Sequence, residues 1–150
     1  MTGSDYPVSK FRERESPHIR VLYVDDDQDF LEIVKVILEN KEDISVDITA
    51  SGYAALELLK TGGYDIILSD YRMFRMDGME FLKQARELDS QIPFILFSGI
   101  MQDEVIHDAI GRGITSYILK EGDPAVLFDE LEKKIRAAVR HRRDDVYVSQ

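Results

Sequence analysis

Apolar residues follow two different periods along the chain. Short apolar runs that end in polar residues are typical of buried strands, whereas apolar residues three and four positions apart indicate helices. Strands are predicted over residues 19–24, 44–49, 65–69, 93–97 and 115–119. Helices are predicted over residues 29–41, 51–60, 78–88 and 102–112 and from residue 123 onward. Leu88 and Ile110 are expected on the inward faces of the third and fourth helices.

Strands and helices alternate five times along the chain. This order predicts an α/β fold with a doubly wound, five-stranded parallel sheet and helices on both faces. We assign residues 19–140 to this domain, residues 1–18 to a flexible N-terminal arm and residues 141–150 to a C-terminal tail or linker. In an open parallel sheet, reactive groups gather at the carboxyl ends of the strands. Polar residues that directly follow the strands are therefore the candidate functional residues.

Composition narrows the classes of function. The 150 residues include 19 Lys and Arg, 29 Asp and Glu and no cysteine, which gives a net charge of −10. Disulfides, thiolate metal sites and thiol nucleophiles are thereby excluded. The acidic balance disfavours nucleic acid as a partner and favours a divalent cation. No apolar run approaches the ~20 residues of a membrane helix, and residues 1–18 lack the apolar stretch of a signal peptide. We therefore expect a cytoplasmic protein without a membrane partner.

Basic residues concentrate in the predicted last helix. They are Lys133, Lys134, Arg136, Arg140, Arg142 and Arg143. Cations complement the dipole at the C-terminal end of a helix. We interpret this set as the solvent-exposed face and end of the helix rather than as a nucleic-acid site, because the rest of the domain is acidic.

Chemically active side chains follow four of the five predicted strands. Asp25 and Asp26 follow the first strand, Asp70 the third, Ser98 the fourth and Lys120 the fifth. Carboxylates in one cleft repel each other unless a cation neutralises them or their pKa values rise. Such hard oxygen ligands suit Mg²⁺. An aspartate beside a metal ion, a hydroxyl and an ammonium group is a credible phosphoryl acceptor.

Each of these residues also has a simpler structural interpretation. The acidic run over residues 25–27 can cap the helix that follows it, because a helix N-terminus favours negative charge. Asp70 can begin a turn, Ser98 can be a loop residue, and Lys120 can be a solvated lysine. The functional interpretation is favoured because all of them fall at the same edge of the predicted sheet.

The ordered set of motifs resembles the receiver domain of two-component response regulators, over about residues 19–140. Val-Asp-Asp-Asp at 24–27 resembles the acidic pocket of that family, and the segment at 69–78 resembles its phosphoacceptor strand and Met-Asp-Gly loop. Phe-Ser-Gly at 97–99 and Tyr-Ile-Leu-Lys at 117–120 match the hydroxyl, aromatic and lysine positions. The resemblance implies the flavodoxin-like strand order 2-1-3-4-5.

The resemblance also implies the chemistry of the site. Asp70 would accept a phosphoryl group from a histidine of a sensor kinase or phosphotransfer protein. Asp25, Asp26, Asp70 and the backbone carbonyl of Arg72 would bind Mg²⁺ or Mn²⁺. The protein would assist only its own phosphoryl transfer and dephosphorylation, and would otherwise be a signalling protein rather than an enzyme.

A conformational response is implied as well. Ser98 and Lys120 would bind the phosphoryl oxygens, and Tyr117 would turn inward as a rotameric switch. The face formed by the fourth helix, fifth strand and fifth helix would then contact a downstream protein, or a second copy of the chain in a homodimer.

Glu121 stands where the family usually has a proline, so we expect a trans bond after Lys120, because a cis bond before a residue other than proline costs ~3 kcal/mol. Phe74 likewise replaces a usual proline.

Two other functions fit parts of the pattern. A haloacid-dehalogenase-like phosphatase would use Asp25 as its nucleophile and Asp27 as its acid partner, and that spacing is present. However, the threonine expected soon afterwards is missing, and the Asp70 segment would have no role. A receiver-like interaction module that is never phosphorylated would keep only the fold, which the complete set of acid, hydroxyl and lysine positions disfavours.

Overall fold

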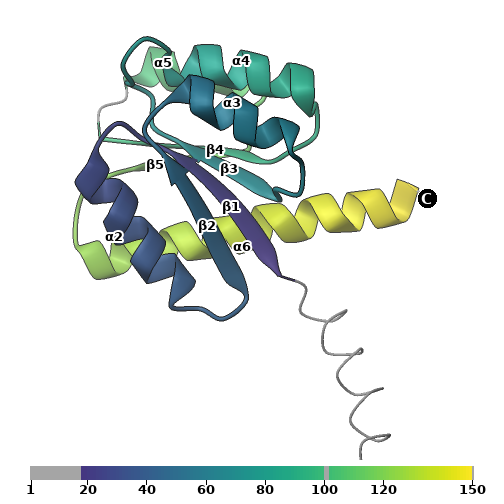
Figure 1. Cartoon of the computed structure of the whole chain (residues 1–150), viewed down its shortest axis with the longest axis horizontal. Helices are drawn as coiled ribbons and strands as arrows, with labels where there is room; N and C mark the ends of the chain where they lie inside the picture. Colours follow the sequence, from purple (N-terminus) through teal and green to yellow (C-terminus); the bar gives the residue numbers. More distant parts are fainter. Residues whose placement is uncertain (1–17, 100–101, 150) are drawn as a thin grey trace, which may run out of the picture.

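Five parallel strands form one sheet in the order β2-β1-β3-β4-β5, which confirms the predicted fold and strand order (Figure 1). The computed structural model describes residues 18–99 and 102–149, so the predicted N-terminal arm lies outside the described residues except for His18. The strands are β1 (Ile19–Val24), β2 (Ile44–Thr49), β3 (Ile66–Ser69), β4 (Phe94–Ser98) and β5 (Ser116–Leu119). The helices are α2 (Gln28–Glu39), α3 (Gly52–Lys60), α4 (Gly78–Leu88), α5 (Asp103–Gly111) and α6 (Pro124–Ser149).

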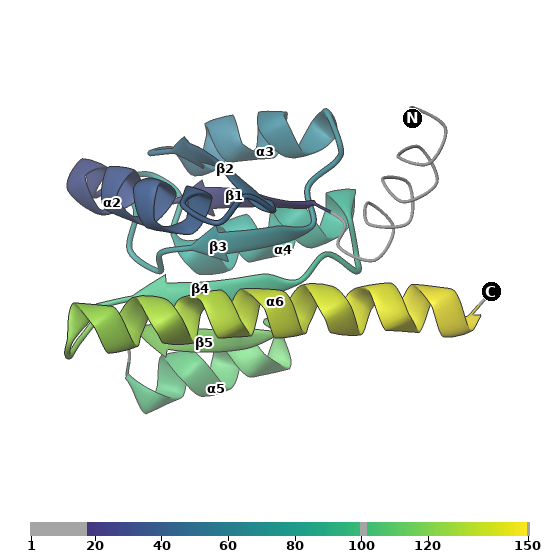
Figure 2. The same ribbon diagram turned by 90° about the horizontal axis from the view of Figure 1, so that it is seen from below.

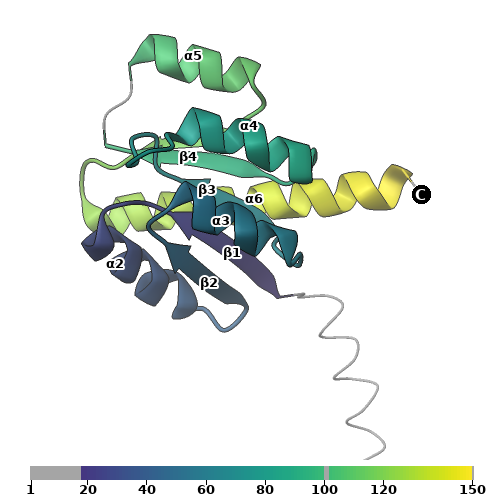
Figure 3. The ribbon, with the colours of Figure 1, turned by 45° about the horizontal axis from the view of Figure 1, so that its top comes forward.

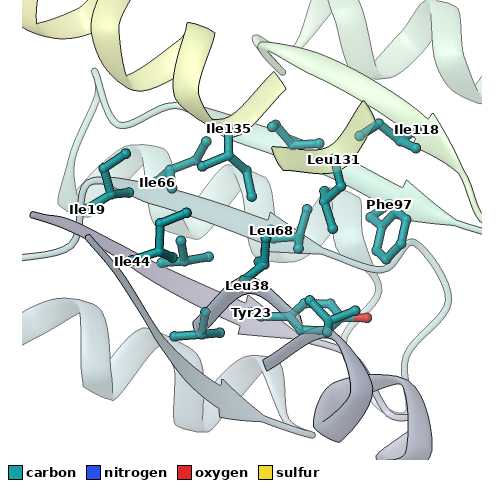
Figure 4. Close-up of a cluster of buried hydrophobic side chains, with 14 of the residues drawn as sticks. Ile19, Tyr23, Leu38, Ile44, Ile66, Leu68, Phe97, Ile118, Leu131 and Ile135 are labelled. Carbon is teal, nitrogen blue, oxygen red and sulfur yellow. The ribbon is translucent and has the colours of Figure 1, made fainter. Parts of the chain in front are cut away.

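Helices cover both faces of the sheet. The helices α2 and α6 pack on one face, and α3, α4 and α5 lie side by side on the other (Figures 2 and 3). Successive residues of a strand point to opposite faces, so Tyr23 enters the cluster under α2 and α6 (Figure 4), whereas Leu22 enters the opposite cluster. Because both faces are buried, the inner strands are almost continuously apolar. No helix within the described residues has the length and apolarity needed to cross a bilayer.

Aspartate and serine side chains cap the first turns of four helices, including α6, where Asp123 accepts from the Ala125 amide at 3.0 Å. Asp27 accepts a hydrogen bond from the Phe30 amide at 3.2 Å at the start of α2, and Ser51 caps α3. Asp77 accepts from two amides at the start of α4. A cap satisfies backbone N–H groups that have no partner inside the helix. The capping interpretation of the acidic run is therefore correct for Asp27.

Gly78 brings the start of α4 against the end of β3. Its amide donates to the Tyr71 carbonyl at 2.7 Å. A Cβ atom at this position would lie 2.5 Å from the Asp70 carbonyl oxygen and 3.0 Å from the Cα atom of Tyr71. Both neighbours are backbone atoms, which cannot turn away as a side chain can. Glycine is therefore required by close packing beside Asp70.

Gly78→Ala should destabilise the folded protein by roughly 1–3 kcal/mol, the usual cost of overpacking. Gly111→Ala is the matched control, because nothing lies within 4 Å of a Cβ atom there. Alanine in place of that helical glycine should stabilise the protein by up to about 1 kcal/mol. Urea denaturation of both variants measures the two effects. Equal stabilities would show that the backbone near Asp70 yields to the added methyl group.

Ion pairs join the C-terminal half of α6 to the amino-terminal end of the sheet. Arg142 lies 3.3 Å from Asp89 Oδ2, and Arg143 lies 3.2 Å from Asp65 Oδ1. These aspartates precede β4 and β3, past which the long helix runs (Figure 2). The interpretation of the whole basic set as a solvent-exposed face is therefore wrong for these arginines. The helix also continues past Arg140 to Ser149, so the predicted tail or linker is helical there.

A third arginine of α6, Arg136, makes two hydrogen bonds to Asp43, at 2.7 and 2.9 Å, and so lowers the pKa of that carboxyl. A carboxyl whose pKa is lowered by folding stabilises the protein above its unfolded pKa, and this stabilisation is lost as the pH falls through the folded pKa. Asp43→Asn should therefore cost about 0.5–1 kcal/mol at neutral pH, a small value because both side chains are about a third exposed and solvent screens the pair. This loss of stability should disappear once the pH is below the folded pKa of Asp43. Urea denaturation over a pH series tests this, and a cost independent of pH would contradict it.

Two residues that are predicted to face the core are exposed instead, so these predictions are wrong. Leu88 is 45% exposed and Ile110 is 57% exposed. Both lie in the last turn of a short helix. In α5, only Ala109 is buried, so this helix rests on the sheet through a narrow contact.

Candidate functional site

Three carboxylates meet at the carboxyl ends of β1 and β3. Each of Asp25, Asp26 and Asp70 has a carboxylate oxygen within 4.8 Å of one from each of the others. The two strands are neighbours in the sheet, and the Asp70 amide donates to the Val24 carbonyl at 2.9 Å. Adjacent strand ends therefore bring residues far apart in sequence into one cluster, as predicted.

Asp25 is fully buried, and three donors hold its carboxylate. The Tyr23 hydroxyl donates to Oδ2 at 2.6 Å, and the Asp27 amide donates to Oδ1 at 3.0 Å. Lys120 Nζ lies 2.5 Å from the same Oδ2 atom. Burial of a carboxylate is costly unless it is paired and hydrogen-bonded, and these donors meet that need.

Asp70 is more accessible than Asp25, with 12% of its side chain exposed against 0%. Its Oδ1 accepts from the Tyr71 amide at 2.7 Å, and its Oδ2 lies 3.5 Å from Lys120 Nζ. Burial and the neighbouring Asp25 charge raise the pKa of Asp70, whereas Lys120 and a hydrogen bond from Ser98 act in the opposite direction. The carboxylate is thus reachable, oriented by the backbone and close to a cation.

Lys120 bridges the two strand ends. Its side chain is 8% exposed, and its ammonium contacts both Asp25 and Asp70. The rings of Phe30 and Phe97 lie 4.6 and 5.3 Å from Nζ, which adds cation–π attraction. The described residues contain no cis peptide bond, so the bond after Lys120 is trans as expected. The lysine reaches the cluster without the cis bond.

The cluster fits a divalent cation. Three carboxylates so close together repel one another, and Lys120 supplies only one positive charge. Oxygen donors of this kind suit Mg²⁺, which binds through one or two carboxylates and keeps several waters. Asp25, Asp26 and Asp70 are the side chains that could hold the ion. The Arg72 carbonyl, in the loop after β3, stays a predicted ligand.

Tyr117 stands apart from these residues. It lies on β5, is 37% exposed and lines a groove with residues of α5 and α6. Lys134 donates to its backbone carbonyl at 3.1 Å and lies 5.9 Å from its ring. Its role as a switch stays a prediction.

Sequence reasoning missed the aromatic residues that support the site, Tyr23 and Phe30. A signal for Tyr23 was present, because side chains two positions apart in a strand share a face and Tyr23 precedes Asp25 by two. No comparable signal marked Phe30, since its contact with Lys120 depends on how α2 packs beside the end of β5.

Known proteins with similar sequences and structures carry the same domain. The sequence matches the response regulator receiver domain family over residues 21–132. Transcriptional regulatory protein ZraR of Escherichia coli (strain K12) is 31% identical over 124 residues, which cover 83% of this chain and 27% of that protein. A protein-glutamate methylesterase/protein-glutamine glutaminase of Trichodesmium erythraeum is 36% identical over 107 residues, which cover 69% of this chain and 30% of that protein. This chain therefore spans less than a third of these relatives.

Solved structures agree with the sequence match. The receiver domain of the Francisella response regulator 1452 superposes with a TM-score of 0.74 at 27% identity, over 83% of this chain and 98% of that one. The response regulator domain of Thermotoga maritima CheB gives a TM-score of 0.74 at 26% identity, over 82% and 97% of the two chains. The chain belongs to the response regulator receiver domain family of two-component signalling.

Proposed function

We propose that Asp70 accepts a phosphoryl group and that its phosphorylation switches a protein-binding face of this receiver domain. One observation carries the proposal. The reachable Asp70 carboxylate lies within one cluster with Asp25 and Asp26 and 3.5 Å from Lys120 Nζ, with the Ser98 hydroxyl as a further partner. Each of these groups can offset charge on a transferring phosphoryl group.

The chemistry is a transfer between two nucleophiles. A carboxylate oxygen of Asp70 forms a bond to phosphorus while the bond from phosphorus to the donor breaks, and the donor leaves as imidazole or, from acetyl phosphate, as acetate. Lys120 and Ser98 would bind phosphoryl oxygens. Mg²⁺, held by the carboxylates, would neutralise charge on the same group. Attack of water on phosphorus later returns the free carboxylate and inorganic phosphate.

A phosphatase that uses Asp25 as its nucleophile is disfavoured. Asp25 is fully buried, and three donors already occupy its oxygens. Its supposed acid partner, Asp27, accepts from the amide of Phe30 as a helix cap. Neither side chain is placed to attack a substrate or to donate a proton to one.

The proposed output face is α5, β5 and α6, the fourth helix, fifth strand and fifth helix expected from sequence. A groove of about 740 Å³ lies there, lined by residues that include Ile110, Tyr117 and Lys134. A histidine kinase or phosphotransfer protein would supply the phosphoryl group, and a downstream protein, an effector domain or a second copy would read this face. The relatives named as transcriptional regulators are several times longer than this chain, so a part in such a regulator belongs to the proposal too.

Labelling with acetyl phosphate tests the proposal. The protein is incubated with acetyl phosphate and Mg²⁺, or with acetyl phosphate and a chelator, and its mass is measured. One base-labile phosphoryl group per chain is expected with Mg²⁺ and far less with the chelator. Absence of an adduct under both conditions would favour an interaction module that is never phosphorylated.

A further inference from the structure

Tyr23 places a hydroxyl group next to the site from within the hydrophobic core. Its side chain is fully buried among the residues under α2 and α6, with its ring centroid 6.2 Å from that of Phe97 (Figure 4). The hydroxyl donates to Asp25 Oδ2 at 2.6 Å. Burial and the charge of Asp25 raise the pKa of Tyr23 above its ordinary value.

Asp25 Oδ2 has two side-chain donors, the Tyr23 hydroxyl and the Lys120 ammonium group. The ring of Tyr23 is packed on all sides, which fixes its hydroxyl. Lys120 is a flexible side chain that already contacts two carboxylates, 2.5 Å from Asp25 and 3.5 Å from Asp70. Under the proposed function, on which this inference rests, the ammonium group must turn toward phosphoryl oxygens on Asp70. Asp25 Oδ2 would then lose one of its donors while still buried.

We propose that the Tyr23 hydroxyl is a positioning group that keeps Asp25 Oδ2 hydrogen-bonded while Lys120 moves to the phosphoryl group on Asp70. When a buried acceptor loses its hydrogen-bond donor, the protein is destabilised by the full desolvation free energy of that acceptor. With phenylalanine at position 23, movement of Lys120 would leave Oδ2 without any of its present donors. The tyrosine therefore lowers the free energy of the phosphorylated state relative to the unphosphorylated one.

Tyr23→Phe tests this, because it removes the hydroxyl and keeps the ring. The probe is beryllium fluoride at saturating Mg²⁺, an analogue of the phosphoryl group on an aspartate. Its dissociation constant is measured by titration and should rise about tenfold in the variant, the effect of one hydrogen bond to a charged group. Urea denaturation of the same samples records stability separately.

Tyr64→Phe is the matched control. The Tyr64 hydroxyl also donates to an aspartate, Asp47 of the edge strand β2, but Tyr64 precedes β3, whereas Asp70 follows it. Both variants can lose stability, yet only Tyr23→Phe should weaken the binding of beryllium fluoride. Equal affinity in Tyr23→Phe and the wild type would overturn the inference, as would equal weakening in both variants. If the wild type itself binds no beryllium fluoride, the proposed function fails as well.

A second measurement needs no substitution that could unfold the protein. Tyrosines in the wild-type chain are replaced by 3-fluorotyrosine, and fluorine NMR spectra are recorded with Mg²⁺, before and after beryllium fluoride is added. The Tyr23 resonance should shift as its hydroxyl becomes the sole side-chain donor to Asp25 Oδ2, and the Tyr64 resonance should stay in place. An unchanged Tyr23 resonance at saturation would overturn the inference.

Discussion

Asp70→Asn is expected to abolish labelling by acetyl phosphate. The amide is nearly isosteric with the carboxylate, so it can keep the hydrogen bond from the Tyr71 amide, but it has no anionic oxygen to attack phosphorus. It also removes one of the three clustered carboxylates. The loss should therefore be complete within the sensitivity of mass spectrometry, while the fold is retained.

The controls identify the residue that carries the phosphoryl group. Asp108→Asn alters an exposed aspartate on α5, far from the cluster, and should label like the wild type. Borohydride converts an acyl phosphate to homoserine, and peptide sequencing then identifies the modified position. Modification at Asp25, or full labelling of Asp70→Asn, would reject the proposed role of Asp70 and revive the phosphatase interpretation.

Lys120→Met should be the most destabilising of these changes in the absence of Mg²⁺. Lys120 is the only cation recorded in contact with both Asp25 and Asp70 in the described part of the chain. Removing one partner of a buried ion pair leaves an uncompensated charge and costs about 3–5 kcal/mol. Because Tyr23 and the Asp27 amide still donate to Asp25, we expect ~3 kcal/mol, the lower end of that range. Urea denaturation in the presence of a chelator measures it.

Lys133→Met is the matched control for that experiment. Lys133 pairs with Asp129 on the surface of α6, where the two side chains are 77% and 61% exposed. Exposed ion pairs of this kind contribute little to stability, so the free energy of unfolding of Lys133→Met should fall by no more than about 0.5 kcal/mol. Mg²⁺ should restore part of the stability of Lys120→Met by neutralising the same carboxylates, and should leave Lys133→Met unchanged relative to the wild type. Similar losses in both variants would mean that Lys120 contributes no more than a surface lysine.

The fold and the outline of the site could be predicted from local features. The apolar residues of each element repeat with the spacing of a strand or of a helix, so the type of each element could be predicted. The alternation of the two types then predicts a doubly wound sheet. Asp25, Asp70 and Lys120 could be assigned to one edge, because parallel strands place their carboxyl ends together. The exposed side chains of Leu88 and Ile110 could not be foreseen, since a helical period indicates which face is apolar but not how much of that face its neighbours cover.

The sequence by itself thus determined the order of the elements and the chemical types of the residues that follow the strands, because both depend on near neighbours. Only the tertiary structure decided that Asp27 caps a helix while Asp25 turns inward, and that Lys120 reaches Asp25 across 95 positions of the chain. It also decided that Arg136 pairs with Asp43, 93 positions away. The physical reason is that hydrogen bonds and ion pairs depend on distance in space, which the packing of helices against the sheet sets.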